Sequence, residues 1–241
     1  MSTPRFRLPA SRTLSIAFGF AVSASPAMAA FTFFDGTFKD PDWVLSTITN
    51  TNGSTSSSQG FQVASGGNGG SYRSVTHQME VSGQYALVLS VHMSNGAFWD
   101  PSTQGAITSI NYSEDSRNSV GAMGTGLAIS QGGNVYVLRQ PGLLYTFGNW
   151  GTNTRNGILA ADMYRIDASG NFFSNQNPDF SASGGTMQFG FWRGNGSGTT
   201  GAGSFSYDTA IDNWGVEIVI PSPGAFALVG MAGLIVSRRR A

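Results

Sequence analysis

The sequence predicts an all-β protein in which two antiparallel sheets pack face to face as a sandwich. Short stretches of β-forming or alternating apolar residues recur along the chain, and clusters of Gly, Ser, Asn and Thr separate them. No stretch between the two ends has a helical period. The 17 Phe, 7 Tyr and 5 Trp are spread widely, which argues against a disordered chain. Many short strands without intervening helices are typical of a two-sheet sandwich.

The expected strands follow one another through the whole central part of the chain. We place them at residues 31–34, 43–49, 60–64, 72–80, 85–92, 106–112, 126–130, 134–138, 163–166, 186–193 and 210–220. The stretch 85–92 is apolar on both faces at first, as in a central strand. The stretch 210–220 alternates, so that Trp214, Val216 and Ile218 share a core face.

The N-terminus has the parts of a secretory signal peptide. A positive region comes first, with Arg5, Arg7 and Arg12. An apolar stretch follows at residues 14–22, and Ala27 and Ala29 are small residues at the two positions that signal peptidase reads. We expect cleavage after Ala29. A membrane-spanning N-terminal helix is the alternative, but the apolar stretch is short for a span.

The C-terminus has a proline-bounded apolar run that ends in a basic cluster. Pro221 and Pro223 break the preceding strand, Gly224 follows them, and residues 225–236 carry no charge. The cluster consists of Arg238, Arg239 and Arg240. A run of about twelve residues rises only about 18 Å as a helix, against a hydrocarbon thickness of about 30 Å. The run is therefore short for a permanent transmembrane helix.

This tail resembles the PEP-CTERM sorting signal of bacterial exosortase substrates, with Ser222 in place of the usual Glu. The resemblance implies an exosortase-like sorting enzyme and an inner-membrane intermediate with the arginines on the cytoplasmic side. The protein would then reach the cell surface or extracellular matrix. An ordinary tail anchor is the alternative. The expected organisation is a signal peptide at 1–29, a sandwich domain at 30–220 and a sorting signal at 221–241.

Charge and cysteine content narrow the function classes. The chain has 13 basic and 13 acidic residues, but six of the basic ones and none of the acidic ones lie in the two ends. Residues 30–220 therefore carry 7 basic and 13 acidic residues, a formal charge of −6. Such a domain lacks the basic patch that nucleic-acid binding needs. Without cysteine, the exported domain has to be stable without disulfides.

Three motifs carry a second resemblance. They are Asp35-Gly36-Thr37-Phe38 with Trp43, the segment Gly66-Gly67-Asn68-Gly69-Gly70-Ser71-Tyr72-Arg73, and Ile211-Asp212-Asn213-Trp214. The chain resembles the concanavalin A-like and laminin G-like jelly rolls of exported bacterial proteins with this tail. The resemblance implies a jelly-roll sandwich and carries over no catalytic residue. The glycines permit a sharp reversal of the chain.

Asp35 and Asp212 are candidates for a structural calcium site. The first and last strands of a jelly roll commonly pair, so the two carboxylates would lie near each other and could bind calcium with backbone carbonyls. Salt bridges to Arg73 or Arg193, or capping of a turn, are the alternative and carry more weight, because the spacing matches no EF-type loop. No other cofactor is indicated.

Catalytic chemistry finds little support in the sequence. His77 and His92 lie in expected strands, where a structural role is favoured. Glu114 and Asp115 are adjacent, so they would face opposite ways in a strand, and we expect them in a loop. There is no Gly-x-Ser-x-Gly elbow and no cysteine nucleophile. A serine or cysteine hydrolase is thereby disfavoured.

Exposed aromatic residues on a concave sheet face or in a loop are the candidates for ligand binding, because rings stack on sugar faces and amides supply directional hydrogen bonds. The candidates are Trp99, Tyr145, Trp150 and Trp192, with Arg193 beside the last. We assign Trp43 and Trp214 to the core. The sequence thus predicts an exported, non-catalytic component of the envelope or extracellular matrix, structural or bound to an extracellular polysaccharide. A polysaccharide lyase or glycoside hydrolase on the same sandwich is the alternative.

Overall fold

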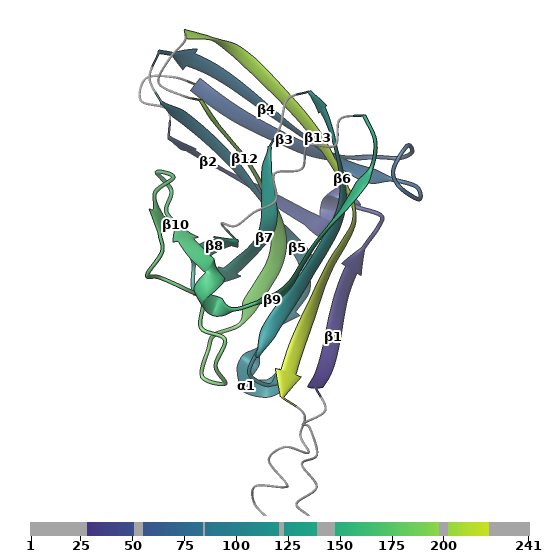
Figure 1. The fold of residues 1–241 in the computed structure, drawn as a ribbon, viewed down its shortest axis with the longest axis vertical. Helices are drawn as coiled ribbons and strands as arrows, with labels where there is room; N and C mark the ends of the chain where they lie inside the picture. Colours follow the sequence, from purple (N-terminus) through teal and green to yellow (C-terminus); the bar gives the residue numbers. More distant parts are fainter. Residues whose placement is uncertain are drawn as a thin grey trace, which may run out of the picture.

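The structure, a computed structural model, describes residues 28–50, 55–83, 85–120, 123–138, 148–197 and 202–221. These residues form two antiparallel sheets that pack face to face (Figure 1). The predicted fold class, an all-β jelly-roll sandwich, is confirmed. The predicted signal peptide and C-terminal sorting helix lie outside the described residues. In the described ranges, no helix is long and apolar enough to cross a membrane.

Sheet A has six strands, in the order β3-β4-β13-β6-β9, with β1 paired to β13 as well. Their bounds are β1 Met28–Asp35, β3 Thr55–Val63, β4 Tyr72–Ser82, β6 Ser109–Val120, β9 Gly151–Ile158 and β13 Ala202–Pro221. The long strand β13 pairs through its first half with β4 and through its second half with β1. The two strands β4 and β1 therefore follow each other along one edge of β13.

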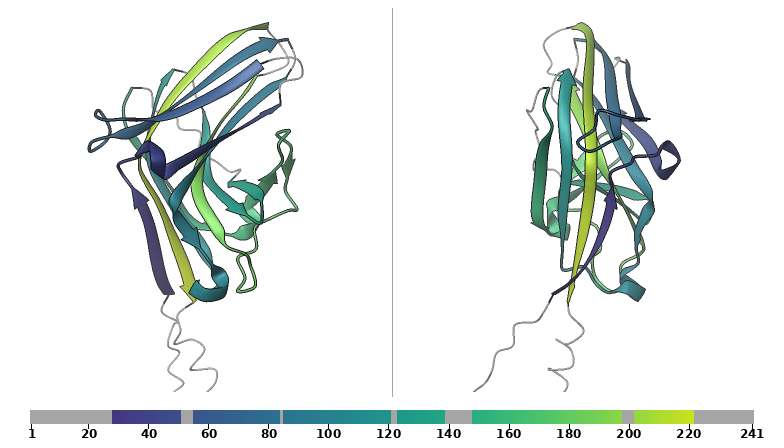
Figure 2. Two further views of the ribbon diagram at one scale, coloured as in Figure 1. Left: turned by 180° about the vertical axis from the view of Figure 1, so that it is seen from behind. Right: turned by 90° about the vertical axis from the view of Figure 1, so that its right-hand side faces the viewer.

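Sheet B has seven strands, in the order β11-β10-β8-β7-β12-β5-β2. Their bounds are β2 Trp43–Asn50, β5 Ala86–Trp99, β7 Gly124–Gln131, β8 Asn134–Leu138, β10 Met163–Ile166, β11 Phe172–Phe173 and β12 Met187–Ser197. Helical structure in the described ranges is limited to single turns, η1 Asp40–Asp42, α1 Pro101–Gln104 and η2 Ala160–Asp162. The side view in Figure 2 shows the two sheets as the layers of a narrow sandwich.

Each expected strand overlaps an observed one, and two short strands were missed. The missed strands are β9, which carries a single buried residue, and β11, which has two residues. The loop expected at Glu114 and Asp115 is wrong, because both lie within β6. Their side chains face opposite ways there: Glu114 points into the sandwich, whereas Asp115 lies on the outer face of sheet A.

The interior combines an aromatic core with a polar layer. Trp43 lies 5.1 Å from Trp214 and 5.3 Å from Phe191 between ring centroids, so the predicted core positions of Trp43 and Trp214 are confirmed. Burying rings of this size stabilises the fold by about 2 to 3 kcal/mol each. Among polar residues, His77 is fully buried and its ring nitrogens bond to Asn195 and Ser90.

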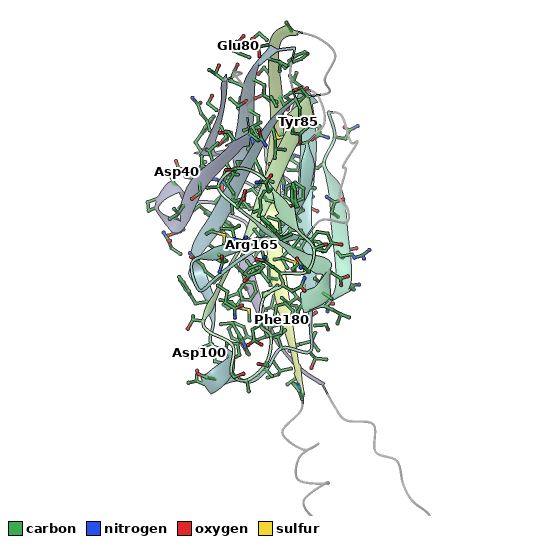
Figure 3. All side chains as sticks on the ribbon, turned by 90° about the vertical axis from the view of Figure 1, so that its left-hand side faces the viewer. Asp40, Glu80, Tyr85, Asp100, Arg165 and Phe180 are labelled. Carbon is green, nitrogen blue, oxygen red and sulfur yellow. The ribbon has the colours of Figure 1, made fainter. Side chains whose placement is uncertain are left out.

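The chain enters and leaves the described sandwich at the same end. Met28 pairs with Pro221 in the antiparallel register of β1 with β13. The start of β1 and the end of β13 therefore lie side by side, as Figures 1 and 2 show. Figure 3 places Asp100, at the start of α1, at this end and Glu80 at the opposite end. The strand β1 begins at Met28, two residues before the domain boundary expected from the signal-peptide pattern.

Candidate functional site

A groove runs over the outer face of sheet A, where β1, β13, β6 and β9 lie side by side. Strand alternation creates this face: Trp214, Val216 and Ile218 point into the core, so Gly215 and Glu217 between them point outward. We call it the sheet groove. It has a volume of about 270 Å³ and is lined by Thr32, Phe34, Asn111, Tyr112, Ser113, Thr154, Asn156, Gly215, Val216 and Glu217.

Gly215 keeps the floor of the sheet groove open. A Cβ at this position would lie 2.8 Å from Ser113 Oγ, in space that the groove now occupies. The walls carry amides and hydroxyls, and one of them is held in place: Asn111 Nδ2 donates to Glu217 Oε2 at 2.6 Å, while Asn111 Oδ1 accepts from the Gly157 amide at 2.9 Å. The groove therefore presents fixed polar groups over a flat backbone floor.

Phe34 is the most exposed large apolar side chain in the described ranges, with 65% of its surface accessible. It pairs with Gly215 across the β1–β13 ladder, so no side chain on that residue covers its ring. Phe34 lines the sheet groove, and it is also among the residues that line a second hollow. A ring in this position can stack on a planar or sugar ligand.

The second hollow lies at the side of the sandwich, between β1 and the middle of β5, and we call it the side cleft. It has a volume of about 430 Å³ and is lined by Phe33, Phe34, Asp35, Asp42, Ser94, Asn95, Gly96, Ala97 and Trp214. A bulge in β5 frames it: Met93 pairs with Gly190 and Phe98 with Gln188, so residues 94–97 leave the ladder with β12. Bulges of this kind often lie beside binding sites.

A bulge in β13 shapes the same face next to the sheet groove. The register with β6 shifts between Asp212 and Gly215, and Asn213 takes a left-handed backbone with φ of 48°. Its Nδ2 donates to Asp115 Oδ2 at 2.7 Å, and Asn68 Nδ2 donates to the same oxygen at 2.8 Å. Although burial opposes ionisation, these donors and Thr152 hold the pKa of Asp115 below its usual range.

Trp150 lies further along this face and is partly exposed. Its Nε1 donates to the Gly66 carbonyl at 3.2 Å, and the Arg117 guanidinium lies over both its ring, at 4.9 Å, and that of Tyr72, at 5.4 Å. Of the aromatic residues predicted to bind ligand, Trp150 is the one found on the outer face of sheet A.

The structure gives Asp35 a turn-capping role. Its Oδ1 accepts from the Thr37 and Phe38 amides, at 2.6 and 3.0 Å, and its Oδ2 accepts from Trp43 Nε1 at 2.7 Å. Burial raises the pKa of this carboxyl, but these hydrogen bonds outweigh burial and leave the pKa below its usual value. Both oxygens are thus engaged by donors, and Asp35 does not fit the role of calcium ligand in this arrangement.

Asp212 is different, because its Oδ2 is buried and has no hydrogen-bond partner in the described part of the chain. Burial, together with the nearby carboxylates of Asp115 and Asp35, raises its pKa, although the backbone amides of Asn213 and Asn68 act in the opposite direction. A Cβ at Gly67 would lie 2.6 Å from this oxygen, 2.7 Å from the Ser71 carbonyl oxygen and 2.9 Å from that of Gly70. A side chain at residue 67 would therefore clash, and the three oxygens lie near one another around Gly67, beside the β3–β4 turn.

Neither arginine considered as a partner of these carboxylates reaches them. Arg73 pairs with Asp40 at 3.0 Å, and its Nε donates to His92 Nδ1. Arg193 is buried and pairs with Glu114 at 3.1 Å. In the described ranges, no group of three or more His, Cys, Asp or Glu side chains is placed to hold a metal ion. A cation at Asp212 would therefore depend on backbone carbonyls.

Two predicted ligand-binding residues are buried. Trp99 is 3% exposed, because it ends β5 inside the sandwich, packs 5.7 Å from Phe31 and donates from Nε1 to the Gly105 carbonyl. Arg193 is 1% exposed, since it alternates inward on β12, where Glu114 neutralises it. The ligand-binding role expected for both is therefore wrong in this fold. Tyr145 lies outside the described residues.

Trp192 is partly exposed but belongs to the outer face of sheet B. Its ring lies over three glycines, since Cβ atoms at Gly124, Gly126 and Gly194 would each fall about 3 Å from it. Its Nε1 donates to the Leu138 carbonyl at 3.1 Å. Trp192 and the sheet groove therefore lie on different sheets, and the described aromatic candidates do not form one site.

Sequence reasoning missed the residues that line the sheet groove. The expected strand 31–34 contains Phe34 but does not by itself say which face its side chain takes. The alternation of Phe31 to Phe34 puts Thr32 and Phe34 on one face, opposite the core residue Phe33, so the signal was present. Asn111 and Asn156 gave no such signal, because their place depends on which strands become neighbours.

Comparisons with solved structures find remote likenesses, among them the following three. No protein-family model matches the sequence, and no curated protein matches it. The family 11 carbohydrate-binding module of the cellulosomal cellulase Lic26A-Cel5E of Clostridium thermocellum is 11% identical, with a TM-score of 0.39, and the alignment covers 83% of this chain and 97% of the module. A solution structure of CtCBM11 is 13% identical, with a TM-score of 0.41. Its alignment covers 83% of this chain and 98% of that chain.

The third likeness is to TmCBM61 in complex with β-1,4-galactotriose, which is 9% identical with a TM-score of 0.30. That alignment covers 72% of this chain and 91% of the other. With TM-scores this low, the three likenesses say nothing about the residues or the ligand of this chain.

Proposed function

We propose that this protein binds a neutral polysaccharide on the outer face of sheet A and does not chemically change it. The observation that carries the proposal is Phe34, an aromatic ring 65% exposed beside a groove with a glycine floor and amide and hydroxyl walls. Leaving such a ring in water costs free energy, whereas a sugar ring stacked on it removes that apolar surface from water. An extended chain fits an open sheet face.

The polar walls of the sheet groove supply directional hydrogen bonds, which stacking alone does not provide. Asn156, Thr154 and Thr32 line the sheet groove, and amide and hydroxyl groups both donate and accept hydrogen bonds, as sugar hydroxyls do. Neither hollow is lined by a basic side chain among the described residues, and carboxylates line both. An acidic polysaccharide would meet repulsion here, which favours a neutral one.

The carboxylates near the two hollows do not have the character that glycoside hydrolysis needs. That reaction uses two carboxyl groups, one of which keeps its proton through a raised pKa. Glu217 is the one carboxylate among the lining residues of the sheet groove. The side cleft has two, Asp35 and Asp42, of which Asp35 is kept ionised by its lowered pKa and Asp42 is exposed to water. Asp212, with its raised pKa, lines neither hollow. These features support a non-catalytic role.

We also propose that a calcium ion binds Asp212 beside this face. Its buried Oδ2 lies near the carbonyl oxygens of Gly70 and Ser71 at the β3–β4 turn, and calcium takes carboxylate and carbonyl oxygens at about 2.3 to 2.6 Å. The ion would neutralise the charge that makes Asp212 costly to bury. It would also fix the β3–β4 turn against the bulge of β13.

For the chain as a whole we propose export and sorting to the cell surface or extracellular matrix through the PEP-CTERM-like tail. Signal peptidase and an exosortase-like enzyme are the partners that this proposal requires. Because Met28 and Pro221 are paired at one end of the sandwich, a membrane-held tail would leave the sheet groove on the flank of the domain, open to a polymer.

The proposal is tested by affinity electrophoresis of the purified full-length protein in gels containing β-glucan, xylan, mannan or galactan, with polygalacturonate and alginate as acidic comparisons. We expect retardation by at least one neutral polymer. Phe34→Ala should weaken that binding about tenfold, because stacking contributes on the order of 1 kcal/mol or more. Phe61→Ala is the matched control, since Phe61 is 46% exposed and lines neither hollow. Unchanged mobility in every polymer would refute the proposal.

A further inference from the structure

The outer face of sheet B carries a tryptophan that lies along the sheet. Trp192 points outward on β12, between Phe191 and Arg193, which are buried and point inward. Three glycines of β7 and β12 leave space for its ring. Cβ atoms at Gly124, Gly126 and Gly194 would lie 3.1, 2.9 and 2.9 Å from Cη2, Nε1 and Cζ3 of the indole. Because these atoms belong to both rings of the indole, the backbone covers one side of the whole side chain.

This indole is held in one position and remains accessible. Its Nε1 donates to the Leu138 carbonyl at 3.1 Å, and its ring packs against the apolar cluster of the outer face, which includes Ile48, Leu89 and Val91. Trp192 is still partly exposed, and the glycine floor covers its inner side, so its accessible surface faces away from the sheet. A ring that is already fixed loses little conformational entropy when a ligand stacks on it.

Sheet B is concave on this side. The strands β10 and β11 form one edge of the sheet, and β2 forms the other. A Cβ at Gly170, in the turn between β10 and β11, would nevertheless lie 2.8 Å from Leu87 Cδ2 of β5 and 3.4 Å from Asn50 Cβ of β2. In a flat sheet, β10 and β2 would lie five strands apart, or about 24 Å. The sheet therefore curls around its outer face.

A second aromatic ring lies further along β12. Tyr85 is 41% exposed, and a Cβ at Gly196 would lie 3.6 Å from its Cε2 and its Oη. Gly194, under the indole, and Gly196, beside the phenol, are two residues apart on the outward side of β12, a rise of about 7 Å. One oligosaccharide can therefore contact both rings.

We propose that Trp192 and Tyr85 form a second binding platform, where a neutral sugar chain stacks on the concave outer face of sheet B. The C–H face of a sugar ring covers an aromatic ring, and neither these two rings nor the glycines beneath them carry a charge that favours an ionic ligand. The described contacts of the platform do not include the amide and hydroxyl walls of the sheet groove, so the platform is the weaker of the two sites.

The platform and the sheet groove lie on the outer faces of different sheets, so they face opposite sides of the sandwich. One protein molecule can then hold two polymer chains and cross-link them. This cross-linking rests on the proposed function, whereas the platform itself does not. The groove determines the affinity for a single chain, and the platform determines whether two chains are joined.

Two variants remove one ring each, Tyr85→Ala and Trp192→Ala. The first acts on an exposed side chain, so it decides the question if the second lowers stability. Phe205→Ala is the matched control, because Phe205 is also 41% exposed, belongs to β13 of sheet A and lines neither hollow. Melting temperatures show whether each variant is folded.

The experiment combines calorimetric titration of the full-length protein with glucan, xylan, mannan and galactan hexasaccharides and light scattering with the corresponding polymers. We expect two binding events per protein, the weaker of which Tyr85→Ala and Trp192→Ala weaken about tenfold while the tighter is unchanged. Phe34→Ala should do the reverse. The unchanged protein and Phe205→Ala should form large polymer-linked particles, and the two ring variants should not.

The outcomes separate the platform from the proposed function. A single binding event that Phe34→Ala removes, or a weaker event that both ring variants leave intact, overturns the platform and leaves the groove. A single event that the ring variants remove and Phe34→Ala leaves intact overturns the groove and leaves the platform. If no oligosaccharide or polymer binds, both fail. Particles that form without polymer overturn the cross-linking, because the protein would then associate with itself.

Discussion

Phe34 owes its exposure to its place in β1. Its neighbour Phe33 points into the core, so period-two alternation directs Phe34 outward, and its ladder partner Gly215 has no side chain to cover it. Asp212 is the reverse case, a charged group that is buried. The exposed ring of Phe34 and the buried charge of Asp212 are both unfavourable in free energy. In our account, the polysaccharide covers the ring and calcium neutralises the charge.

Calcium should stabilise the protein through Asp212. At a concentration about a hundred times the dissociation constant, calcium would raise the free energy of unfolding by about 3 kcal/mol. Asp212→Asn removes the charge, so calcium should no longer have this effect. Without calcium, the variant should melt at a higher temperature than the unchanged protein, because a neutral amide is not repelled by the carboxylates of Asp115 and Asp35. Thermal unfolding with calcium and with chelator measures both. Equal calcium responses in the two proteins would contradict the site.

Stability should fall in acid because of His77. Burial lowers its folded pKa to about 4 from an unfolded value of 6.5, and the Arg193 charge acts in the same direction. Above pH 6.5 neither state binds the proton, and the full stability is present. As the pH falls from 6.5 to 4, the unfolded chain takes up a proton that the folded one does not, so about 3 kcal/mol of unfolding free energy is lost.

Denaturant unfolding between pH 7 and 4 checks this pH dependence. His77→Gln is the informative variant, because an amide can bond to Asn195 and Ser90 without titrating. Its pH dependence should be shallower than that of the unchanged protein. His92 will contribute as well, since burial and the charge of Arg73 lower its pKa well below the ordinary value.

At the scale of the elements, the site depends on strand neighbours that the sequence does not reveal. Strands such as 134–138 were predicted with the observed bounds because their apolar residues are dense. The strand β9 was missed, since GTNTRNGI has one buried residue and reads as a loop. Yet β9 supplies Thr154 and Asn156 to the sheet groove. An edge strand that faces water carries little hydrophobic signal, and for the same reason it carries polar binding groups.

The same limit explains the errors at Trp99 and Arg193. Trp99 is flanked by Asn, Gly, Asp and Pro and reads as a loop residue, but those neighbours form the bulge and turn at the end of β5, around a ring that remains in the core. Arg193 is buried because β12 places it opposite Glu114 of the other sheet. A contact between residues 79 positions apart leaves no mark on the local pattern.

The strand β13 should tolerate a substitution that removes binding. Gly215→Val adds a side chain to the floor of the sheet groove, and the nearest atom is Ser113 Oγ, which can rotate away. We expect polysaccharide affinity to fall at least tenfold while the melting temperature changes little, as valine suits a strand. Gly203→Val in the same strand lies outside both hollows and should leave binding unchanged. Retained binding by Gly215→Val would contradict the groove.

At the scale of the whole molecule, the sandwich separates stability from recognition. The aromatic core and the buried pair of Arg193 with Glu114 lie between the sheets, whereas the sheet groove lies on the outside of sheet A. Removing one partner of a buried pair leaves an uncompensated charge, so Arg193→Met should lower the free energy of unfolding by about 3 to 5 kcal/mol. Chemical denaturation measures this loss. If the variant still folds, its polysaccharide affinity should be unchanged, and a large loss of affinity would link the interior to the site.

The central claim is that a neutral polysaccharide chain lies on the outer face of sheet A. Chemical-shift mapping by NMR, with an oligosaccharide of the polymer that binds best, locates the ligand directly. We predict that the largest shifts fall on Phe34, Gly215 and Asn111. Shifts centred on Trp192 and the outer face of sheet B, with none at Phe34, would contradict the account.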